Sequence, residues 1–299
     1  MPTERSVDNV RFETGIIGLG ERMEAKNSAG DEDVPDYFAR TRLDGRIFAI
    51  FGAGRGIGRQ CAHAIHQAGA LIVCIDQDEE RCRKVADEVR GSAIVADLTT
   101  EGAPDSVIEQ IIRDHGRLDG IVDIVGASFG AGFIKADADL IRRNFELNLY
   151  QAMAVTRAGA EAMAKTGGGT IVLVGSISAI AALPNQVIYG TSKAALHHFV
   201  RCAAAELGHL GVRLNAVAPG YVRTERMIDR FDSDFWNEIA SNTPLQRCGE
   251  TSDIAAPVVF LSQDVSSFIT GQVLVADGGL LAPIRAMREP SGRQIAGQP

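Results

Sequence analysis

A turn with four glycines, from Gly52 to Gly58 (GAGRGIG), joins two segments whose hydrophobic patterns differ. Residues 46–51 (RIFAIF) form a run typical of a short buried strand, and residues 57–67 show the pattern of a helix. Glycine permits positive φ and close backbone approach, while a helix N-terminus presents unpaired N–H groups and a partial positive charge. The turn therefore predicts a strand-to-helix corner that can hold a diphosphate, with candidate contacts at Gly52, Gly54, Arg55, Gly56, Ile57 and Gly58.

Strand and helix patterns alternate along the rest of the chain. We expect strands at residues 70–75, 92–95, 120–125, 169–174 and 212–217, and helices at residues 79–89, 105–114 and 140–164. Because strands that alternate with helices form parallel sheets, we predict an α/β fold with a Rossmann-type, doubly wound parallel sheet in a single domain. A length of 299 residues with 45% hydrophobic residues is ordinary for one such domain.

An acidic residue, Asp76, ends the strand that follows the glycine turn. At about 20 residues after such a turn, a carboxylate can accept hydrogen bonds from the adenosine ribose of a dinucleotide. Its charge would repel the 2′-phosphate of NADP and so favours NAD. Arg55 argues mildly for NADP, but the fold fixes the position of Asp76 relative to the ribose better. We therefore predict NAD as the cofactor.

The pentapeptide YGTSK places Tyr189 and Lys193 four residues apart. If Tyr189 opens a helix, both side chains lie on one face and can point into one pocket. A phenol, with a solution pKa near 10, carries protons at neutral pH only if a nearby cation stabilises the phenolate. Lys193 could be that cation. The pair also occurs by chance in many helices, and the upstream glycine turn is what favours the functional interpretation.

Together these motifs resemble the short-chain dehydrogenase/reductase family, of the compact single-domain type. The resemblance runs from about Leu43 to about Leu281. The glycine turn resembles the family's TGxxxGIG, and residues 271–279 resemble its last strand and turn. Ser176 precedes Tyr189 by 13 residues, as the family's catalytic serine does.

The resemblance implies a role for each catalytic candidate. Tyr189 would take the alcohol proton in oxidation and return it in reduction, and Lys193 would also hold the hydroxyls of the nicotinamide ribose. Ser176 would hydrogen-bond the substrate oxygen; only its spacing favours it over Ser178. Asn148 would anchor a water that links Lys193 to solvent, its alternative role being to satisfy local backbone groups. The further cofactor contacts that the resemblance implies are Asp97, Leu98, Gly126, Tyr189, Lys193, Pro219, Gly220, Val222 and Thr224.

Two segments depart from the family pattern. Phe51 stands where the family usually has threonine, and residues 123–126 (DIVG) stand where it usually has Asn-Asn-Ala-Gly. Because these segments adjoin in the family, their joint change predicts a repacked strand pair beside the cofactor. Local geometry and cofactor affinity are affected, while every proton-transfer residue is retained.

The loops after the predicted strands bear on the substrate. They are mostly apolar and favour a hydrophobic secondary alcohol or ketone, although the same residues could simply close the core. The apolar residues are Phe129, Phe133, Ile180, Leu183, Val187, Met227, Ile228, Phe231, Phe235 and Trp236.

Three functions compete. The first is an NAD-dependent oxidoreductase for such an alcohol and ketone. The second is a reductase of 3-oxoacyl thioesters; Asp76 counts against it, because reductive biosynthesis generally uses NADPH. The third is a non-catalytic, NAD-binding scaffold protein on the same fold. Its mark would be an incomplete Ser, Tyr and Lys set, and here the set is complete.

Charge and cysteines exclude other classes. The net charge of -8 disfavours nucleic-acid partners and anionic membranes, and no apolar run is long enough to span a bilayer. Five cysteines without paired spacing or Cys/His clusters predict reduced thiols, a cytoplasmic protein and no metal site. The resemblance implies a homo-oligomer, a tetramer or dimer, with helices at residues 140–164 and 194–207 as candidate interfaces.

Residues 1–42 are predicted to form an N-terminal extension ahead of the domain at residues 43–299, which ends in a short tail from about residue 282. The extension lacks the basic-then-apolar order of a signal peptide. It is either a partly disordered tail or an arm that packs on a second subunit or over the site. The apolar residues that favour an arm are Ile16, Ile17, Leu19, Tyr37 and Phe38.

Overall fold

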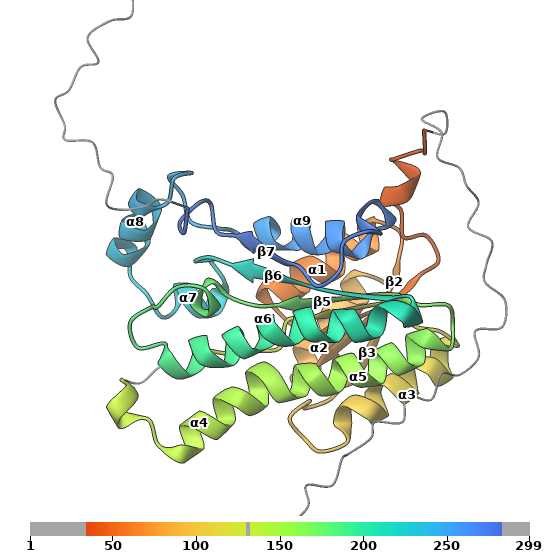
Figure 1. The fold of residues 1–299 in the computed structure, drawn as a ribbon, viewed down its shortest axis with the longest axis horizontal. Helices are drawn as coiled ribbons and strands as arrows, with labels where there is room; N and C mark the ends of the chain where they lie inside the picture. Colours follow the sequence, from red (N-terminus) through yellow and green to blue (C-terminus); the bar gives the residue numbers. More distant parts are fainter. Residues whose placement is uncertain (1–33, 130–131, 283–299) are drawn as a thin grey trace, which may run out of the picture. The chain divides into compact units, whose positions relative to one another are not determined.

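The computed structural model describes residues 34–129 and 132–282. Its centre is a parallel sheet in which the strands follow the order β3-β2-β1-β4-β5-β6-β7 (Figure 1). The prediction of a doubly wound, Rossmann-type parallel sheet is confirmed. The strands are β1 (Ile47–Phe51), β2 (Leu71–Asp76), β3 (Ser92–Val95), β4 (Gly120–Asp123), β5 (Gly169–Val174), β6 (Val212–Pro219) and β7 (Val273–Ala276).

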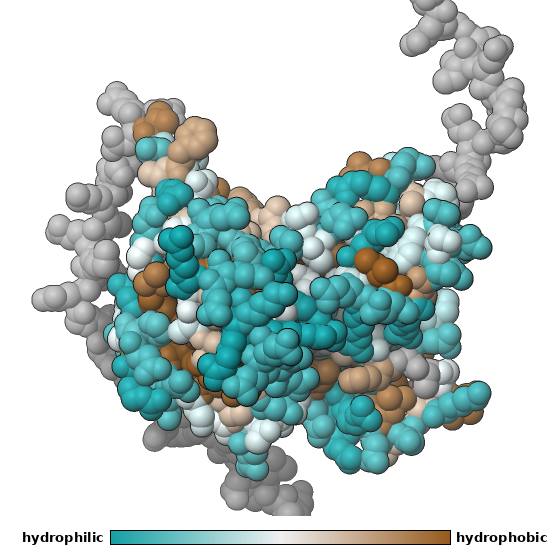
Figure 2. Space-filling view, turned by 180° about the vertical axis from the view of Figure 1, so that it is seen from behind, coloured by the Kyte–Doolittle hydropathy of each residue, from teal (hydrophilic) through white to brown (hydrophobic). Residues whose placement is uncertain are grey.

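Helices cover both faces of this sheet. One layer contains α1 (Gly56–Gln67), α2 (Glu79–Glu88) and α9 (Thr251–Ser262), and the other contains α3 (Ala103–His115), α5 (Gln151–Ala164) and α6 (Val187–Leu207). The face of the molecule shown in Figure 2 is mostly hydrophilic, with hydrophobic side chains scattered over it. The shorter elements are α4 (Ala138–Phe145), α7 (Glu225–Ile228), α8 (Ser233–Asn242), η1 (Ala39–Thr41), η2 (Phe133–Lys135), η3 (Glu146–Tyr150), η4 (Ile177–Ala179), η5 (Gly208–Leu210) and η6 (Asp264–Ser266).

Burial on both faces explains why β1 reads as a continuous apolar run. All five of its residues are buried. Ala49 and Phe51 belong to the core on the α3, α5 and α6 side, whereas Phe48 and Ile50 belong to the core on the α1, α2 and α9 side. Successive side chains of a strand point to opposite faces, so a strand between two helical layers needs apolar residues at every position.

The predicted helix at residues 140–164 is not one regular helix, which corrects the sequence-based prediction. It begins earlier, at Ala138, and α4 passes into α5 through the π-helical segment η3. A π-helical turn accommodates an additional residue between two α-helical stretches and often occurs at functional sites. Asn148 lies within this segment.

The chain reverses its direction of winding between β1 and β4, which are neighbours in the sheet. In open α/β sheets, ligands bind outside the carboxyl ends of the strands at such a switch point. Phe51 and Asp123 are register partners there, and the N–H of Ile124 donates to the carbonyl of Phe51. The two departures from the family pattern therefore do adjoin.

The first described residues include contacts with the end of the domain. Arg40 donates to the carbonyl of Asp264 and to the hydroxyl of Ser267, and Gln263 donates to the carbonyl of Thr41. The apolar arm residues Ile16, Ile17 and Leu19 lie outside the described residues. The boundary at residue 42 and the role of the extension stay predictions.

Candidate active site

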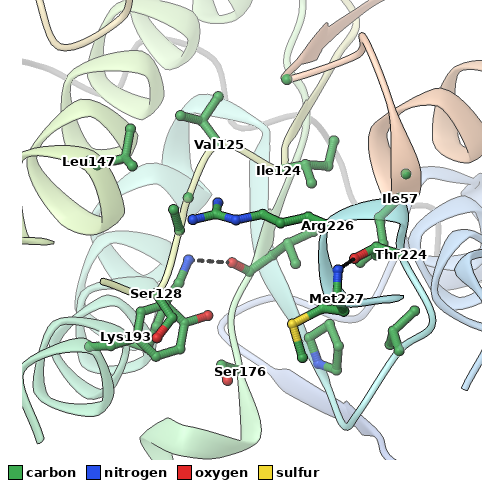
Figure 3. A pocket seen from close by; sticks show the side chains of 18 of the residues that line it. Ile57, Ile124, Val125, Ser128, Leu147, Ser176, Lys193, Thr224, Arg226 and Met227 are labelled. Atoms are coloured by element: carbon green, nitrogen blue, oxygen red, sulfur yellow. Dashed lines mark hydrogen bonds between the residues drawn. The ribbon is translucent and has the colours of Figure 1, made fainter. Parts of the chain in front are cut away.

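A cavity of about 730 Å³ opens at the carboxyl ends of the central strands, at the switch point (Figure 3). Most predicted site residues line it. They are Gly52, Arg55, Gly56, Ile57, Asp76, Asp97, Leu98, Gly126, Ser176, Tyr189, Lys193, Pro219, Gly220, Val222 and Thr224. Gly54, Gly58 and Asn148 do not line it.

The glycine turn leaves no room for side chains at two positions. A Cβ at Gly58 would lie 1.9 Å from the carbonyl oxygen of Gly52, and one at Gly54 would lie 2.8 Å from a carboxylate oxygen of Asp76. Gly52 and Gly56 have φ of 82° and 56°, in the region that favours glycine. The turn is therefore held close to β1 and to the start of α1, with its backbone open to the cavity.

Asp76 is fixed at the edge of the glycine turn. One carboxylate oxygen accepts from the N–H of Gly54 at 2.8 Å, and the other accepts from the N–H of Asp78 at 3.1 Å. A carboxylate oxygen has a second lone pair, so each can still accept a hydrogen bond from a ligand hydroxyl. The carboxylate thus stands beside the turn, as the sequence predicts.

Lys193 is buried inside α6. Its Nζ donates to the carbonyl of Val174 at 2.9 Å, and it lies 6.0 Å from the ring centroid of Tyr189. Burial lowers the pKa of Lys193 to about 8, and the carboxylate of Asp123 acts in the opposite direction. The charge of Lys193 therefore has a partner inside the protein.

That partner, Asp123, is itself 3% exposed at the end of β4. Burial raises its pKa to about 6, while the N–H of Val125, the charge of Lys193 and the amide of Gln151 lower it. Asp123 accepts from Val125 at 2.9 Å and from Gln151 Nε2 at 3.1 Å. The sequence marked this position only as a departure from the family pattern, and its charge beside Lys193 was missed.

Tyr189 lies in the first turn of α6, which begins two residues earlier, at Val187. Burial raises its pKa, and the Ser176 hydroxyl and the charge of Arg226 lower it. Lys193 Nζ lies 6.0 Å from the centroid of the same ring. Its role as the cation that stabilises the phenolate stays a prediction.

Ser176 is positioned by its neighbours. Its Oγ donates to Ser178 Oγ and accepts from the N–H of Ser178, both at 3.1 Å, and its own N–H donates to His197 Nε2 at 3.4 Å. Burial lowers the pKa of His197 to about 4, with smaller contributions from Lys193 and Arg201, which keeps the ring neutral. Ser176 and Ser178 both line the cavity, so spacing remains the reason to prefer Ser176.

Asn148 connects the π-helical segment to the loop after β4. Its Oδ1 accepts from the N–H of Ala127 at 3.0 Å, and its Nδ2 donates to the carbonyls of Ala127 and Asn144. A Cβ at Gly126 would lie 2.7 Å from Asn148 Oδ1 and 3.1 Å from Lys193 Nζ, so these two atoms face the same point. The side chain satisfies local backbone groups; its role in anchoring a water stays a prediction.

The apolar substrate residues were predicted only in part. Phe129, Leu183 and Met227 line the cavity. The others do not, and they include residues that are largely exposed, such as Phe133 and Ile180 at 61% and 54%. Phe231, Phe235 and Trp236 instead pack on one another at the start of α8. Apolar composition in a loop does not reveal which way each side chain points.

Comparisons with known proteins agree with this geometry. The sequence model of a family described as enoyl-(acyl carrier protein) reductase matches residues 52–281. The 7α-hydroxysteroid dehydrogenase of Escherichia coli (strain K12) is 33% identical over 243 residues, which cover 80% of this chain and 95% of that protein. The chain belongs to the short-chain dehydrogenase/reductase family. Like other members of this family, it is an oxidoreductase that acts on a CH–OH group and binds a nicotinamide cofactor.

Two further relatives show the breadth of the family. A 3-oxoacyl-[acyl-carrier-protein] reductase of Thermotoga maritima is 31% identical and covers 80% of this chain and 99% of that protein. A solved structure of 7α-hydroxysteroid dehydrogenase, complexed with NADH and 7-oxo glycochenodeoxycholic acid, superposes with a TM-score of 0.78 at 31% identity. It covers 82% of this chain and 98% of its own.

The cavity fits such a cofactor. No described side chain caps the N-terminus of α1, so the N–H groups of its first turn are open to phosphate oxygens. Among residues 34–129 and 132–282, no cluster of His, Cys, Asp or Glu is arranged to hold a metal ion. Within the same ranges, no helix has the length and apolar character that crossing a bilayer requires. All five cysteines are free thiols.

Proposed function

We propose that the protein interconverts a secondary alcohol and its ketone with NAD, and that Tyr189 is the general acid and base. The observation that carries this proposal is the meeting of Ser176, Tyr189 and Lys193 in one cavity with the glycine turn. Nicotinamide, when bound, supplies or accepts the hydride. The chain itself must orient the substrate and move one proton.

The proton moves at the phenolic oxygen of Tyr189. In oxidation this oxygen, as phenolate, takes the proton of the alcohol, and in reduction the phenol returns a proton to the carbonyl oxygen. The Ser176 hydroxyl hydrogen-bonds the same substrate oxygen and holds it within reach of Tyr189. Lys193 holds the nicotinamide ribose and keeps a positive charge near the phenolate, and Asn148 fixes the π-helical segment beside it.

NAD is proposed because the Asp76 carboxylate lies beside the glycine turn, where its charge would repel the 2′-phosphate of NADP. Arg55, which also lines the cavity, would be free to contact the diphosphate instead. Reduction of 3-oxoacyl thioesters remains the second candidate, because a 3-oxoacyl-[acyl-carrier-protein] reductase is among the relatives. The two differ in cofactor and substrate, so assays with both cofactors and both substrate classes separate them.

The experiment that tests this function is a panel of secondary alcohols, ketones and 3-oxoacyl thioesters, followed by nicotinamide absorbance with NAD and NADP in parallel. We expect turnover of alcohols with NAD. Tyr189→Phe removes only the hydroxyl, so it is expected to lower kcat about 10²- to 10⁴-fold while NADH binding persists.

Tyr221→Phe is the matched control, because Tyr221 lines the same cavity and has no role in the proposed proton transfer. We expect it to retain most of its turnover. Full activity in Tyr189→Phe would assign the proton to another residue. Absence of turnover with every substrate would favour the non-catalytic, NAD-binding alternative.

A further inference from the structure

Arg226 places a positive charge in the cavity that the proton transfer does not require. It is the second residue of α7, a short helix capped by Thr224, whose side chain accepts from the N–H of Met227. Figure 3 shows the side chain of Arg226 extended into the cavity, toward the side that holds Val125 and Lys193. The direction of this side chain is set by the fold of the loop after β6, which the sequence does not reveal.

Within the described ranges, no hydrogen bond or salt bridge joins Arg226 to another residue. Other arginines of this chain do have carboxylate partners, such as Arg247 with Asp253 and Arg46 with Asp264. A guanidinium is always charged and carries five N–H donors in a planar fork that matches a carboxylate. Arg226 therefore presents unused donors to whatever enters the cavity.

Two more arginines, Arg55 and Arg230, line the same cavity. The pKa of Arg226 is lowered first by burial and then by these two positive charges. Of the acids in the lining, Asp76 is the last residue of β2, Asp97 follows β3, and Glu225 is adjacent to Arg226 in α7. Adjacent helical residues do not face each other, so Glu225 does not neutralise Arg226. Three like charges in one cavity indicate an anionic ligand.

The position of Arg226 distinguishes it from Arg55. Arg55 belongs to the glycine turn and is suited to the diphosphate. Arg226 instead extends toward the side of the cavity that holds Lys193 (Figure 3), and its charge lowers the pKa of Tyr189. Apolar side chains, those of Phe129, Leu183 and Met227, line the cavity as well.

We propose that Arg226 binds a carboxylate on the substrate, so that the preferred substrate is a hydroxy acid, or the matching keto acid, with an apolar body. This inference rests on the proposed alcohol and ketone chemistry and specifies its substrate class. The carboxylate is held at Arg226 while the alcohol carbon lies at Ser176 and Tyr189. Arg226 is thus a residue that determines specificity and does not itself carry the proton.

The experiment compares a ladder of secondary hydroxy acids, with increasing length between the alcohol carbon and the carboxylate, with their methyl esters. Each pair is assayed at saturating NAD. We expect the wild-type protein to prefer the acid at one length by about 10- to 100-fold in kcat/KM, as for loss of a charge-assisted hydrogen bond. Arg226→Gln is expected to remove this preference by raising the KM for the acid. Arg226→Lys, which keeps the positive charge, is expected to retain part of the preference.

Arg223→Gln is the control, because Arg223 precedes the same helix but interacts with Glu250 and with the ring of Trp236, away from the cavity. It is expected to leave the preference unchanged. Wild-type protein that oxidises acids and esters equally would overturn the inference while leaving the alcohol chemistry intact. Equal loss on acid and ester, with a higher KM for NAD in Arg226→Gln, would also overturn it and assign Arg226 to the diphosphate.

A binding measurement makes the inference independent of turnover. Trp236 is the sole tryptophan and lies in the segment that follows α7, so its fluorescence can report ligand binding. The hydroxy acids are titrated into the protein with NADH present. We expect saturable binding that Arg226→Gln weakens about tenfold or more. Binding that is equal in both proteins would contradict the assignment even if no alcohol were oxidised.

Discussion

The ammonium of Lys193 and the carboxylate of Asp123 depend on each other. Burial alone would favour the neutral form of each group, and each charge favours the charged form of the other. With pKa values of about 6 for Asp123 and about 8 for Lys193, both groups are charged near neutral pH. The aspartate that departs from the family pattern thus raises the pKa of Lys193 and helps to keep its ammonium charged.

Asp123→Asn is expected to shift the pH dependence of alcohol oxidation. Without the carboxylate, the pKa of Lys193 falls further below its usual range, so a smaller fraction of Lys193 is charged at the pH of the assay. A neutral Lys193 no longer favours the phenolate, and the midpoint of kcat against pH at saturating NAD moves upward by about one unit.

Asp119→Asn is the matched control for this measurement. Asp119 is a buried carboxylate that directly precedes the same strand, where Arg117 holds it. We expect the control to keep the wild-type midpoint. A folded Asp123→Asn protein with an unchanged midpoint would remove Asp123 from the mechanism.

Asp76→Asn tests the cofactor preference, because the amide keeps the size of the side chain and one acceptor oxygen but removes the charge. Repulsion of the 2′-phosphate then disappears, and the ratio of kcat/KM for NAD to that for NADP is expected to fall about tenfold, equivalent to about 1.4 kcal/mol. Asp97→Asn changes a second acid of the cavity lining, which is expected to face adenine and to leave this ratio unchanged. A wild-type protein that prefers NADP would refute the assignment to NAD.

At the scale of the elements, the glycine turn depends on the approach of α1 to β1. Gly58→Ala would place a Cβ 1.9 Å from a backbone oxygen, which cannot move aside as a flexible side chain can. We expect a lower melting temperature, corresponding to about 1–3 kcal/mol of overpacking, and weaker NADH binding, because the turn itself must shift.

Gly208→Ala is the control for that change. Gly208 has φ of -58°, and a Cβ there would meet no atom within 4 Å. Both variants are compared by thermal unfolding and by NADH fluorescence. Equal stability and equal NADH binding in the two variants would show that the turn tolerates a side chain.

The central strands were predictable because their burial on both faces leaves a clear apolar pattern, and β5 has the predicted bounds. The edge strand β3 also has the predicted bounds, although only one of its residues is buried. The π-helical segment at Glu146–Tyr150 was not predictable, because one additional residue barely changes the helical pattern around it. Tyr189 and Lys193 could be paired from their spacing together with the upstream glycine turn. Arg226 could not be placed, because the direction of its side chain depends on how the loop after β6 folds.

At the scale of the whole molecule, several apolar side chains are left exposed outside the cavity. Tyr150 and Met153, on the helix surface formed by η3 and α5, are 55% and 41% exposed. At the β7 edge of the sheet, Leu274 is 40% exposed, and Phe268, before that strand, is fully exposed. Exposed apolar patches and unpaired strand edges are common at interfaces between subunits. The two surfaces lie on different elements, so each could form a separate contact between subunits, as in a tetramer built from two dimers.

We therefore expect a homo-oligomer that separates into smaller assemblies when one of the two surfaces is disrupted. Met153→Glu puts a charge on the helix surface, and Phe268→Glu puts one at the β7 edge; burying either charge without a partner disfavours association. If both surfaces are used, each variant sediments as a dimer and the double variant as a monomer, while the wild-type protein sediments as a tetramer. Sedimentation velocity over a range of concentrations measures this directly. Circular dichroism confirms that each variant is folded, which is expected because both side chains are exposed in the single chain.

If only Met153→Glu alters the sedimentation coefficient, the protein is a dimer joined through the helix surface. A wild-type protein that sediments as a monomer at assay concentrations would contradict the expectation of an oligomer.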